Sequence, residues 1–258
     1  MTGVLPVGLA NSTKVIGNVI HSVKEYVMVI QLHGDVAEQD LRRVAGYFRG
    51  EIYQRPPLRS SVKRAIRVRR IHEIEVLEVR GRFALIRVLS DPGTYMRKLA
   101  HDIGLLLGVG AHMRELRRTR TGPYREDETL VRLQDVSEAL LLWRSNGDER
   151  YLRRIVLPVE TSIAHLPKIM ILDTAVDAIA HGANLAAPGV ARLTRNIAKG
   201  STVAILTLKG ELVALGTAMY SSGEIARMEK GIIAKTRRVV MPPGVYPSTW
   251  RHGKGTQG

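Results

Sequence analysis

Alternating apolar and polar positions predict β-strands in the first half of the chain. Residues 26–33 are rich in strand-forming residues, and the runs at residues 71–79 and 82–90 alternate. The last two runs are joined across Arg80-Gly81, so they predict a β-hairpin. The turn sequence Asp91-Pro92-Gly93 follows the hairpin. Thr94, directly after this turn, is a suitable N-terminal cap for a helix.

Apolar residues at helical spacing predict helices around these strands. Residues 38–49 carry four of them on one face. The helix after the turn has an apolar stripe formed by Tyr95, Leu99, Ile103 and Leu106. Arg97 and His101 share a different face of that helix, one turn apart. A third helix is predicted to begin at Asp135 and to end at Asn146-Gly147.

The remainder of the chain has a different pattern. Pro158 and Pro167 flank a short polar stretch that predicts a domain boundary. Residues 173–181 then predict a short helix ended by Gly182. Three alternating runs follow, at residues 202–208, 211–219 and 238–241. A segment that is mostly strand with one short helix is typical of a small barrel-like β domain. We therefore expect two domains, and for the whole chain an α/β (α+β) fold.

The composition favours a polyanionic partner. The 258 residues include 39 Lys and Arg against 24 Asp and Glu, which gives a formal net charge of +15. The chain has no cysteine, which excludes disulfides, a thiolate zinc site and a cysteine nucleophile. No apolar run is long enough for a membrane helix, and the first residues do not form a secretory signal. We therefore expect a cytoplasmic protein without membrane contact.

Basic residues are concentrated in two stretches. Residues 55–70 hold seven cations and no acid, and residues 114–125 hold five arginines and one acid. Such stretches also occur as solvated surface, but tyrosines lie near both, at positions 53, 95 and 124. Cations interleaved with aromatic residues favour RNA or DNA binding.

No motif for cofactor or metal chemistry stands out. Gly108-Val109-Gly110 precedes no helix at the spacing of a dinucleotide loop, and no phosphate loop or GxSxG elbow occurs. His112 and Glu115 are too few for a metal site. We expect no cofactor and no metal. The residues by themselves therefore predict a nucleic-acid-binding protein and do not reveal a reaction.

Longer motifs are more specific. In the first 130 residues they are TGVLPVGLANSTKVI at 2–16, KEY at 24–26, GEIYQRPPLRSSVKR at 50–64, GTYMRKLAHDIG at 93–104 and GVGAHMRELRRTRTGP at 108–123. They resemble the TruB/dyskerin family of pseudouridine synthases, and LPKIMILDTAVDAIAHGANLAAPGV with LKGELVALGTAM resembles its PUA RNA-binding domain. The HGD turn and the HLPKI segment are similar to the archaeal and eukaryotic branch. The resemblance implies a mixed-sheet catalytic domain over 1–163, incomplete at its N-terminus, a β-barrel-like PUA domain over 164–243 and a flexible tail over 244–258.

The resemblance implies an RNA isomerase that needs no cofactor. Such an enzyme flips a uridine out, breaks its ribose–N1 bond and rejoins the uracil through C5. The essential aspartate of the family lies in a GTLDPxVTG motif. Thr2 and Gly3 match the end of that motif, so the aspartate falls three positions before Met1. We expect a misplaced start codon, with a truly shortened homologue as the alternative, and we expect these 258 residues alone to bind RNA without turnover.

The remaining site residues follow from the same resemblance. Arg97 matches the arginine that pairs with the catalytic aspartate, and Tyr26 matches the tyrosine that stacks on the flipped base. Leu116 matches an apolar residue of the uracil pocket. Cations expected to contact RNA nearby are Lys63, Arg117, Arg118 and Arg120. Residues matching the PUA loop and strand that hold an RNA end are His181, Gly182, Ala183, Asn184 and Gly189.

The resemblance also implies partners. They are tRNA, rRNA, a box H/ACA guide RNA with its ACA tail, and the small proteins of the H/ACA particle. The expected function is uridine isomerisation in the TΨC loop of tRNA, in rRNA or in both, as the catalytic subunit of a box H/ACA guide ribonucleoprotein. The alternative is a non-catalytic RNA-binding or scaffold subunit. A DNA-binding regulator is disfavoured because no helix-turn-helix pattern occurs.

Overall fold

The computed structural model describes residues 2–56 and 65–248. The chain divides into two compact units. The first unit comprises residues 1–6 and 19–156, and the second comprises residues 7–18 and 157–258. Each unit has its own sheet and its own apolar core. Within the described residues, no helix is long and apolar enough to cross a membrane.

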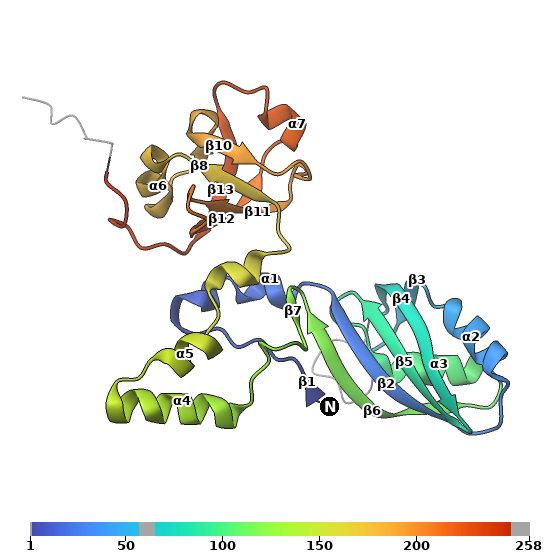
Figure 1. Ribbon diagram of the computed structural model, residues 1–258. Coiled ribbons are helices and arrows are strands. Elements are labelled where there is room, and N and C mark those ends of the chain that lie inside the picture. The colour runs from blue at the N-terminus through green and yellow to red at the C-terminus, as the bar shows by residue number, and fades with distance from the viewer. Residues whose placement is uncertain (1, 57–64, 249–258) are drawn as a thin grey trace, which may run out of the picture. The chain divides into compact units, whose positions relative to one another are not determined.

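The first unit is built on a mixed sheet. Its described strands are β1 (Thr2–Gly3), β2 (Lys24–Leu32), β3 (Gly50–Gln54), β4 (Arg67–Arg80), β5 (Phe83–Ser90), β6 (Ala111–Thr121) and β7 (Tyr124–Arg125). The order across the sheet is β1-β6-β2-β5-β4-β3, and β7 pairs with β6 (Figure 1). β1 runs parallel to β6, whereas the other neighbours are antiparallel. β6 is therefore held between the N-terminal strand and β2.

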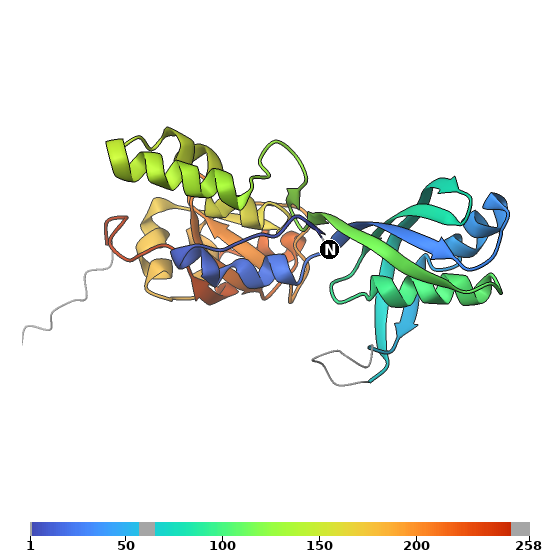
Figure 2. The same cartoon turned by 90° about the horizontal axis from the view of Figure 1, so that it is seen from below.

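Two helices cover one face of this sheet. They are α2 (Glu38–Gly46) and α3 (Met96–Leu106), and α3 lies along β6 (Figure 2). Leu41 of α2, Leu99 of α3 and Met28 of β2 are fully buried in the shared core. Alternate residues of β2 point into that core and away from it, as the period of a strand requires. The face that carries Met28 is therefore the one from which side chains can meet α3.

The structure confirms the predicted hairpin and corrects both adjacent helices. β4 and β5 pair around Gly81, whose φ of +55° is favourable for glycine. The helix expected over residues 38–49 ends at Gly46. The prediction that Thr94 caps α3 is wrong, because its hydroxyl donates to the Asp91 carbonyl at 2.8 Å. Leu106 was expected in the apolar stripe, but it is 60% exposed.

The predicted third helix exists with a different beginning. It is α4 (Leu133–Asn146), followed by α5 (Arg150–Ile155). Asp135 is the third residue of α4, where its carboxylate accepts a hydrogen bond from the Arg132 amide at 2.7 Å. The expected end is confirmed, because Gly147 closes α4 in the left-handed conformation.

The second unit is a smaller mixed sheet with short helices. Its strands are β8 (Lys168–Ile171), β9 (Leu185–Ala186), β10 (Val190–Leu193), β11 (Thr202–Leu206), β12 (Leu212–Ala218) and β13 (Ile232–Val239), in the order β10-β8-β11-β12-β13-β9. Its helices are α6 (Asp173–Ala180), α7 (Ser222–Ile225) and the short 3-10 turns Val159–Ile163 and Ala187–Gly189. The last predicted run, 238–241, covers only the end of β13.

A segment near the N-terminus completes the core of the second unit. It contains the 3-10 turn Ala10–Lys14 and the beginning of α1 (Ile16–Ile20). Val15 is fully buried against Ile163, Leu206 and Leu212. Periodicity along the chain does not predict this contact, because nearly 150 residues separate Val15 from Ile163. The expected mixed α and β architecture is confirmed.

Candidate active site

Strand β6 shifts register twice against β2. Tyr26 lies opposite Arg118 while Glu25 lies opposite Arg120, so Thr119 is an extra residue on β6. In the same way, Arg114 is an extra residue between the partners of Val29 and Ile30. Such bulges redirect the side chains that follow them and often occur beside active sites. Leu116 lies between the two bulges, opposite Met28.

A cavity of about 610 Å³ opens beside this part of β6. Its lining residues come from β1, β2, β6, α3 and the turn before α3, and they are Thr2, Tyr26, Thr94, Tyr95, Met96, Arg97, Met113, Arg114, Glu115 and Leu116. We call this cavity the β6 pocket. It brings together Tyr26 and Leu116, which the resemblance assigns to the reacting base, and Arg97, which it assigns to the catalytic aspartate. Their sequence separation is up to 90 residues, so only the sheet pairing makes them neighbours.

A buried amide holds the beginning of α3 at the pocket wall. The Gln54 side chain is 2% exposed. Its Oε1 accepts a hydrogen bond from the Tyr95 amide at 2.8 Å, and its Nε2 donates to the Tyr95 carbonyl at 3.2 Å. Arg97 follows two residues later, and it is exposed at the pocket. No acid of the described residues forms an ion pair with Arg97. Its guanidinium can therefore take a carboxylate as a partner.

Strand β1 is clamped onto β6 at the pocket. The Val4 amide donates to the Arg118 carbonyl at 2.7 Å, and Arg118 Nε donates back to the Val4 carbonyl at 2.7 Å. Gly3 has φ of +102°, and a Cβ there would lie 2.1 Å from the Arg118 oxygen. Only glycine permits this approach. The clamp places Thr2 at the pocket.

Lys24 fixes the other end of the KEY motif. Its amine donates to the Ile20 carbonyl at 2.7 Å and to the Ser22 carbonyl at 3.0 Å. Burial of the amine, and to a lesser extent repulsion by Arg118, lowers the pKa of Lys24. The side chain is 9% exposed, so this lysine serves the beginning of β2 and is not an RNA-facing cation.

Of the other predicted cations, Arg117, Arg118 and Arg120 lie outside the lining of the β6 pocket. Arg117 pairs with Glu126, and hydrogen bonding by this guanidinium lowers the pKa of the Glu126 carboxyl. Arg118 holds Val4, and Arg120 Nε donates to the Gly122 carbonyl at 2.9 Å. Lys63 lies outside the described residues. The proposed RNA contacts of these cations remain predictions.

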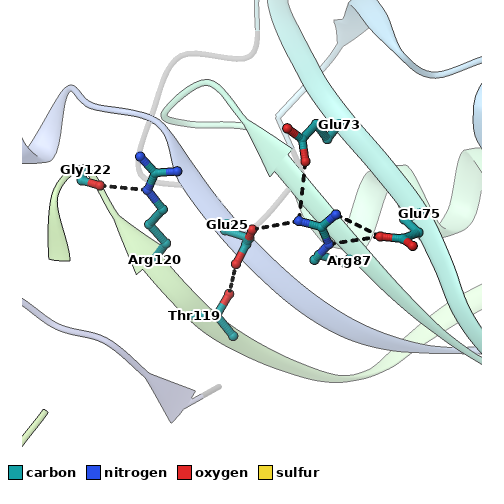
Figure 3. Close-up of polar contacts among 7 residues, drawn as sticks. All are labelled: Glu25, Glu73, Glu75, Arg87, Thr119, Arg120 and Gly122. Atoms are coloured by element: carbon teal, nitrogen blue, oxygen red, sulfur yellow. Dashed lines mark hydrogen bonds and ion pairs between the residues drawn. The ribbon is translucent and has the colours of Figure 1, made fainter. Parts of the chain in front are cut away.

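The opposite face of the sheet carries a polar network (Figure 3). Arg87 of β5 donates to Glu75 of β4 at 2.8 Å and to Glu25 of β2 at 3.2 Å. Glu25 in turn accepts a hydrogen bond from the Thr119 hydroxyl at 2.8 Å. The network therefore connects β4, β5, β2 and β6 behind Tyr26.

His112 has a different neighbour from the one considered in the sequence. Its Nδ1 lies 2.8 Å from His33 Nε2, at the end of β6 away from Arg118. In the part of the chain that the structure describes, no three His, Cys, Asp or Glu side chains are grouped closely enough to hold a metal ion. The weak metal hypothesis for His112 and Glu115 has no support in this arrangement.

In the second unit, the predicted RNA-binding residues lie after α6. Gly182 has φ of +94° and ends the helix, as expected. The Ala183 carbonyl accepts a hydrogen bond from the Thr236 hydroxyl at 2.6 Å, and Asn184 Oδ1 accepts one from the Thr236 amide at 3.1 Å. The loop is thereby fixed to β13. Gly189 packs closely on Ala175, whose Cβ would be 3.0 Å from an added Cβ.

Several pocket residues were not anticipated. They are Thr94, Tyr95, Met96, Met113, Arg114 and Glu115 as lining residues. Recognition of residues 111–121 as a strand would have indicated Met113, because Ala111 and Met113 alternate with polar positions. The bulge at Arg114 has no such signal, since strand pairing determines it. The many arginines of this segment were interpreted only as a basic stretch, so its strand was not predicted.

Comparison with known sequence families covers nearly the whole chain. Residues 1–96 match the TruB family pseudouridylate synthase N-terminal domain, and residues 97–164 match the tRNA pseudouridylate synthase B C-terminal domain. Residues 167–240 match the PUA domain. The first of these ranges includes Tyr26, the second includes Arg97 and Leu116, and the third includes the loop after α6.

Individual relatives give the same result. A protein of Archaeoglobus fulgidus named "Probable tRNA pseudouridine synthase B" is 52% identical over 251 residues, which are 97% of this chain and 77% of the relative. A protein of the same name from Methanopyrus kandleri is 54% identical over 250 residues, 97% of this chain and 74% of the relative.

Solved structures agree with the sequence relatives. A chain of a Cbf5-Nop10-Gar1 complex superposes with a TM-score of 0.91 at 52% identity, covering 95% of this chain and 75% of that chain. A chain of an H/ACA RNP bound to a substrate RNA containing 2'-deoxyuridine gives a TM-score of 0.88 at 48% identity, covering 94% and 73%. The chain therefore belongs to the TruB family of pseudouridine synthases, which are RNA isomerases, and carries a PUA domain.

Proposed function

We propose that this protein converts uridine to pseudouridine in tRNA, in the TΨC loop, in rRNA or in both, as the catalytic subunit of a box H/ACA guide ribonucleoprotein. The observation that carries the proposal is the β6 pocket, because it places Tyr26, Arg97 and Leu116 around one cavity. A volume of about 610 Å³ is enough for a flipped nucleotide.

Each of the three residues has a role that its chemistry supports. Tyr26 stacks on the flipped uracil and assists removal of the C5 proton. Leu116 supplies an apolar wall of the pocket. Arg97 pairs with the catalytic carboxylate and keeps it ionised and oriented. The reaction breaks the bond from ribose C1' to N1, turns the base and forms a bond from C1' to C5, whose proton leaves. No cofactor is needed.

The surrounding cations and the second unit bind the rest of the RNA. Lys63, Arg117, Arg118 and Arg120 contact phosphates near the pocket. The loop from His181 to Asn184, with Gly189, holds an ACA or CCA end. The sequence limits that we propose for this division of labour are residues 1–163 for catalysis and 164–243 for the PUA domain, although residues 7–18 and 157–163 belong to the second compact unit. The expectation of a flexible tail from residue 244 is wrong for its described part, because Tyr246 is 9% exposed in the core of the second unit and its hydroxyl donates to Glu211 at 2.6 Å. Residues 249–258 lie outside the described residues.

The partners proposed for this chain come from its relatives. The structures it resembles contain Nop10, Gar1, or a substrate RNA in an H/ACA RNP. We infer that this chain assembles with small proteins of the same kind and with a guide RNA in the cytoplasm. An archaeal origin, which its relatives share, fits that location.

An assay of binding and turnover tests the proposal. The protein isolated from its native cells is incubated with a uridine-containing tRNA stem-loop, and with a guide RNA plus substrate. RNA binding and pseudouridine formation are measured, and we expect both. Binding without pseudouridine formation would support the scaffold alternative, and absence of RNA binding would overturn the proposal.

A further inference from the structure

The bulge at Thr119 lies where β6 serves both neighbouring strands. On one side of it Tyr26 pairs with Arg118, and on the other side Glu25 pairs with Arg120. The same short stretch of β6 pairs with β1, where Gly3 lies opposite Arg118. A one-residue slip of the bulge would change which side chains of β6 face the pocket, because successive strand residues alternate between faces.

The bulge is held by a hydrogen bond on the face away from the pocket. Thr119 Oγ1, the hydroxyl of the extra residue itself, donates to Glu25 Oε1 at 2.8 Å. The other oxygen of Glu25 accepts a hydrogen bond from Arg87 Nη1 at 3.2 Å. Figure 3 shows Glu25 between these two donors. We call the Thr119–Glu25 pair the clasp.

The surroundings of Glu25 strengthen its hydrogen bond with Thr119. Its side chain is 18% exposed, so its charge is partly removed from water. Arg87 is fixed from the other side by Glu75 at 2.8 Å. Hydrogen bonds to an ionised group in such a setting are stronger than those between neutral groups. Glu25 therefore has little freedom to release Thr119.

We propose that Glu25 and Thr119 are positioning residues that set the pose of Tyr26 for the flipped base. Glu25 directly precedes Tyr26 on β2, and the alternation of a strand places their side chains on opposite faces. The clasp fixes Glu25 against the bulge, and this determines where Tyr26 stands relative to Leu116 on β6. The inference deepens the proposed function and rests on it.

The experiment measures base flipping without requiring turnover. The probe is a tRNA-type stem-loop with 2-aminopurine beside the target uridine, whose fluorescence rises when the uridine leaves the stack. Thr119→Val removes the hydroxyl while keeping a residue that favours strands, and Thr119→Ser retains the hydroxyl. Thr129→Val is the matched control, because Thr129 makes the same kind of bond, to Asp127 at 2.7 Å, outside the pocket lining.

We expect Thr119→Val to shift the flipping equilibrium toward the stacked base by about fivefold, the effect of one net hydrogen bond. The affinity of Thr119→Val for the stem-loop should stay unchanged. The flipping equilibrium of Thr119→Ser and of Thr129→Val should match that of the unsubstituted protein. In a Tyr26→Leu background, Thr119→Val should have no further effect, because the clasp acts through Tyr26.

The remaining outcomes would overturn the inference or the proposed function. Equal flipping by Thr119→Val and the unsubstituted protein would overturn the inference, as would an effect that persists in the Tyr26→Leu background. If Thr119→Val does not fold, Glu25→Met replaces it, because Met keeps most of the side-chain volume but offers no oxygen to accept the Thr119 hydroxyl bond. Unchanged flipping in Glu25→Met also overturns the inference. If the unsubstituted protein binds the stem-loop but gives no fluorescence change, the proposed function fails and the clasp is not implicated.

Discussion

The two sheets of this protein place their functional side chains by different means. In the first unit, the pocket residues project from strands whose register is interrupted at Thr119 and Arg114. In the second unit, the residues predicted to hold RNA lie in a loop that Thr236 fixes to β13. A register change affects several pocket residues at once, whereas a loop is adjusted locally. The first unit should therefore be the more sensitive to single substitutions near its site.

The largest expected effect tests the first unit directly. Arg97→Ala in the active enzyme should lower the rate of pseudouridine formation by about 10²- to 10³-fold, because the carboxylate loses its charged partner. RNA affinity should stay within about threefold, since one exposed cation contributes little to total binding. Single-turnover kinetics and a binding titration measure the two quantities. Arg80→Ala is the control, and a large loss of affinity would make Arg97 a binding residue instead.

The buried amide at the pocket wall should have the next largest effect. Gln54→Met leaves the Tyr95 amide and carbonyl without their side-chain partners and should destabilise the first unit by about 3 kcal/mol. Gln54→Glu keeps the acceptor for the Tyr95 amide but brings a buried carboxylate oxygen against the Tyr95 carbonyl, so it should also destabilise the unit at neutral pH. Urea unfolding measures both. Equal stability of Gln54→Met and the unsubstituted protein would show that the beginning of α3 does not depend on this amide.

Two neighbouring valines, Val15 just before α1 and Val19 within it, belong to different units. Val15 is buried in the core of the second unit, and Val19, one turn later, is 1% exposed and belongs to the first. Val15→Ala should lower the stability of the second unit by about 2 kcal/mol, and Val19→Ala should act on the first. Hydrogen exchange resolved by residue distinguishes them. Loss of protection in the same unit for both variants would contradict the division.

The smallest effect concerns the ion pair beside the pocket. Hydrogen bonding by Arg117 lowers the pKa of Glu126 in the folded protein. The pair therefore adds stability at pH values above the ordinary glutamate pKa, and this contribution is lost as the pH falls through the lowered value. Arg117→Gln should raise the Glu126 pKa toward its ordinary range, as followed by NMR titration. Arg144→Gln serves as the control, and an unchanged pKa in Arg117→Gln would refute the assignment.

Local patterns were sufficient for elements whose own residues decide their structure. The β4–β5 hairpin followed from alternation and Gly81, and the end of α4 followed from Gly147. Strand β6 was not predicted, because its arginines concealed the alternation of the apolar residues. The capping role of Thr94 was wrong because Gln54, some 40 residues earlier, holds the beginning of α3. The candidate site was available from the resemblance, and periodicity alone did not reveal it.

The sequence by itself determined the charge, the absence of cysteine chemistry and the family motifs that point to RNA uridine isomerisation. These are properties of residue type and order, so no packing is needed to establish them. Only the tertiary structure decided that Tyr26, Arg97 and Leu116 line one cavity, that Val15 completes the core of the second unit, and that Thr119 lies in a bulge behind Tyr26. Strand pairing and burial join residues far apart in the chain, and the free energy of those contacts belongs to no local segment.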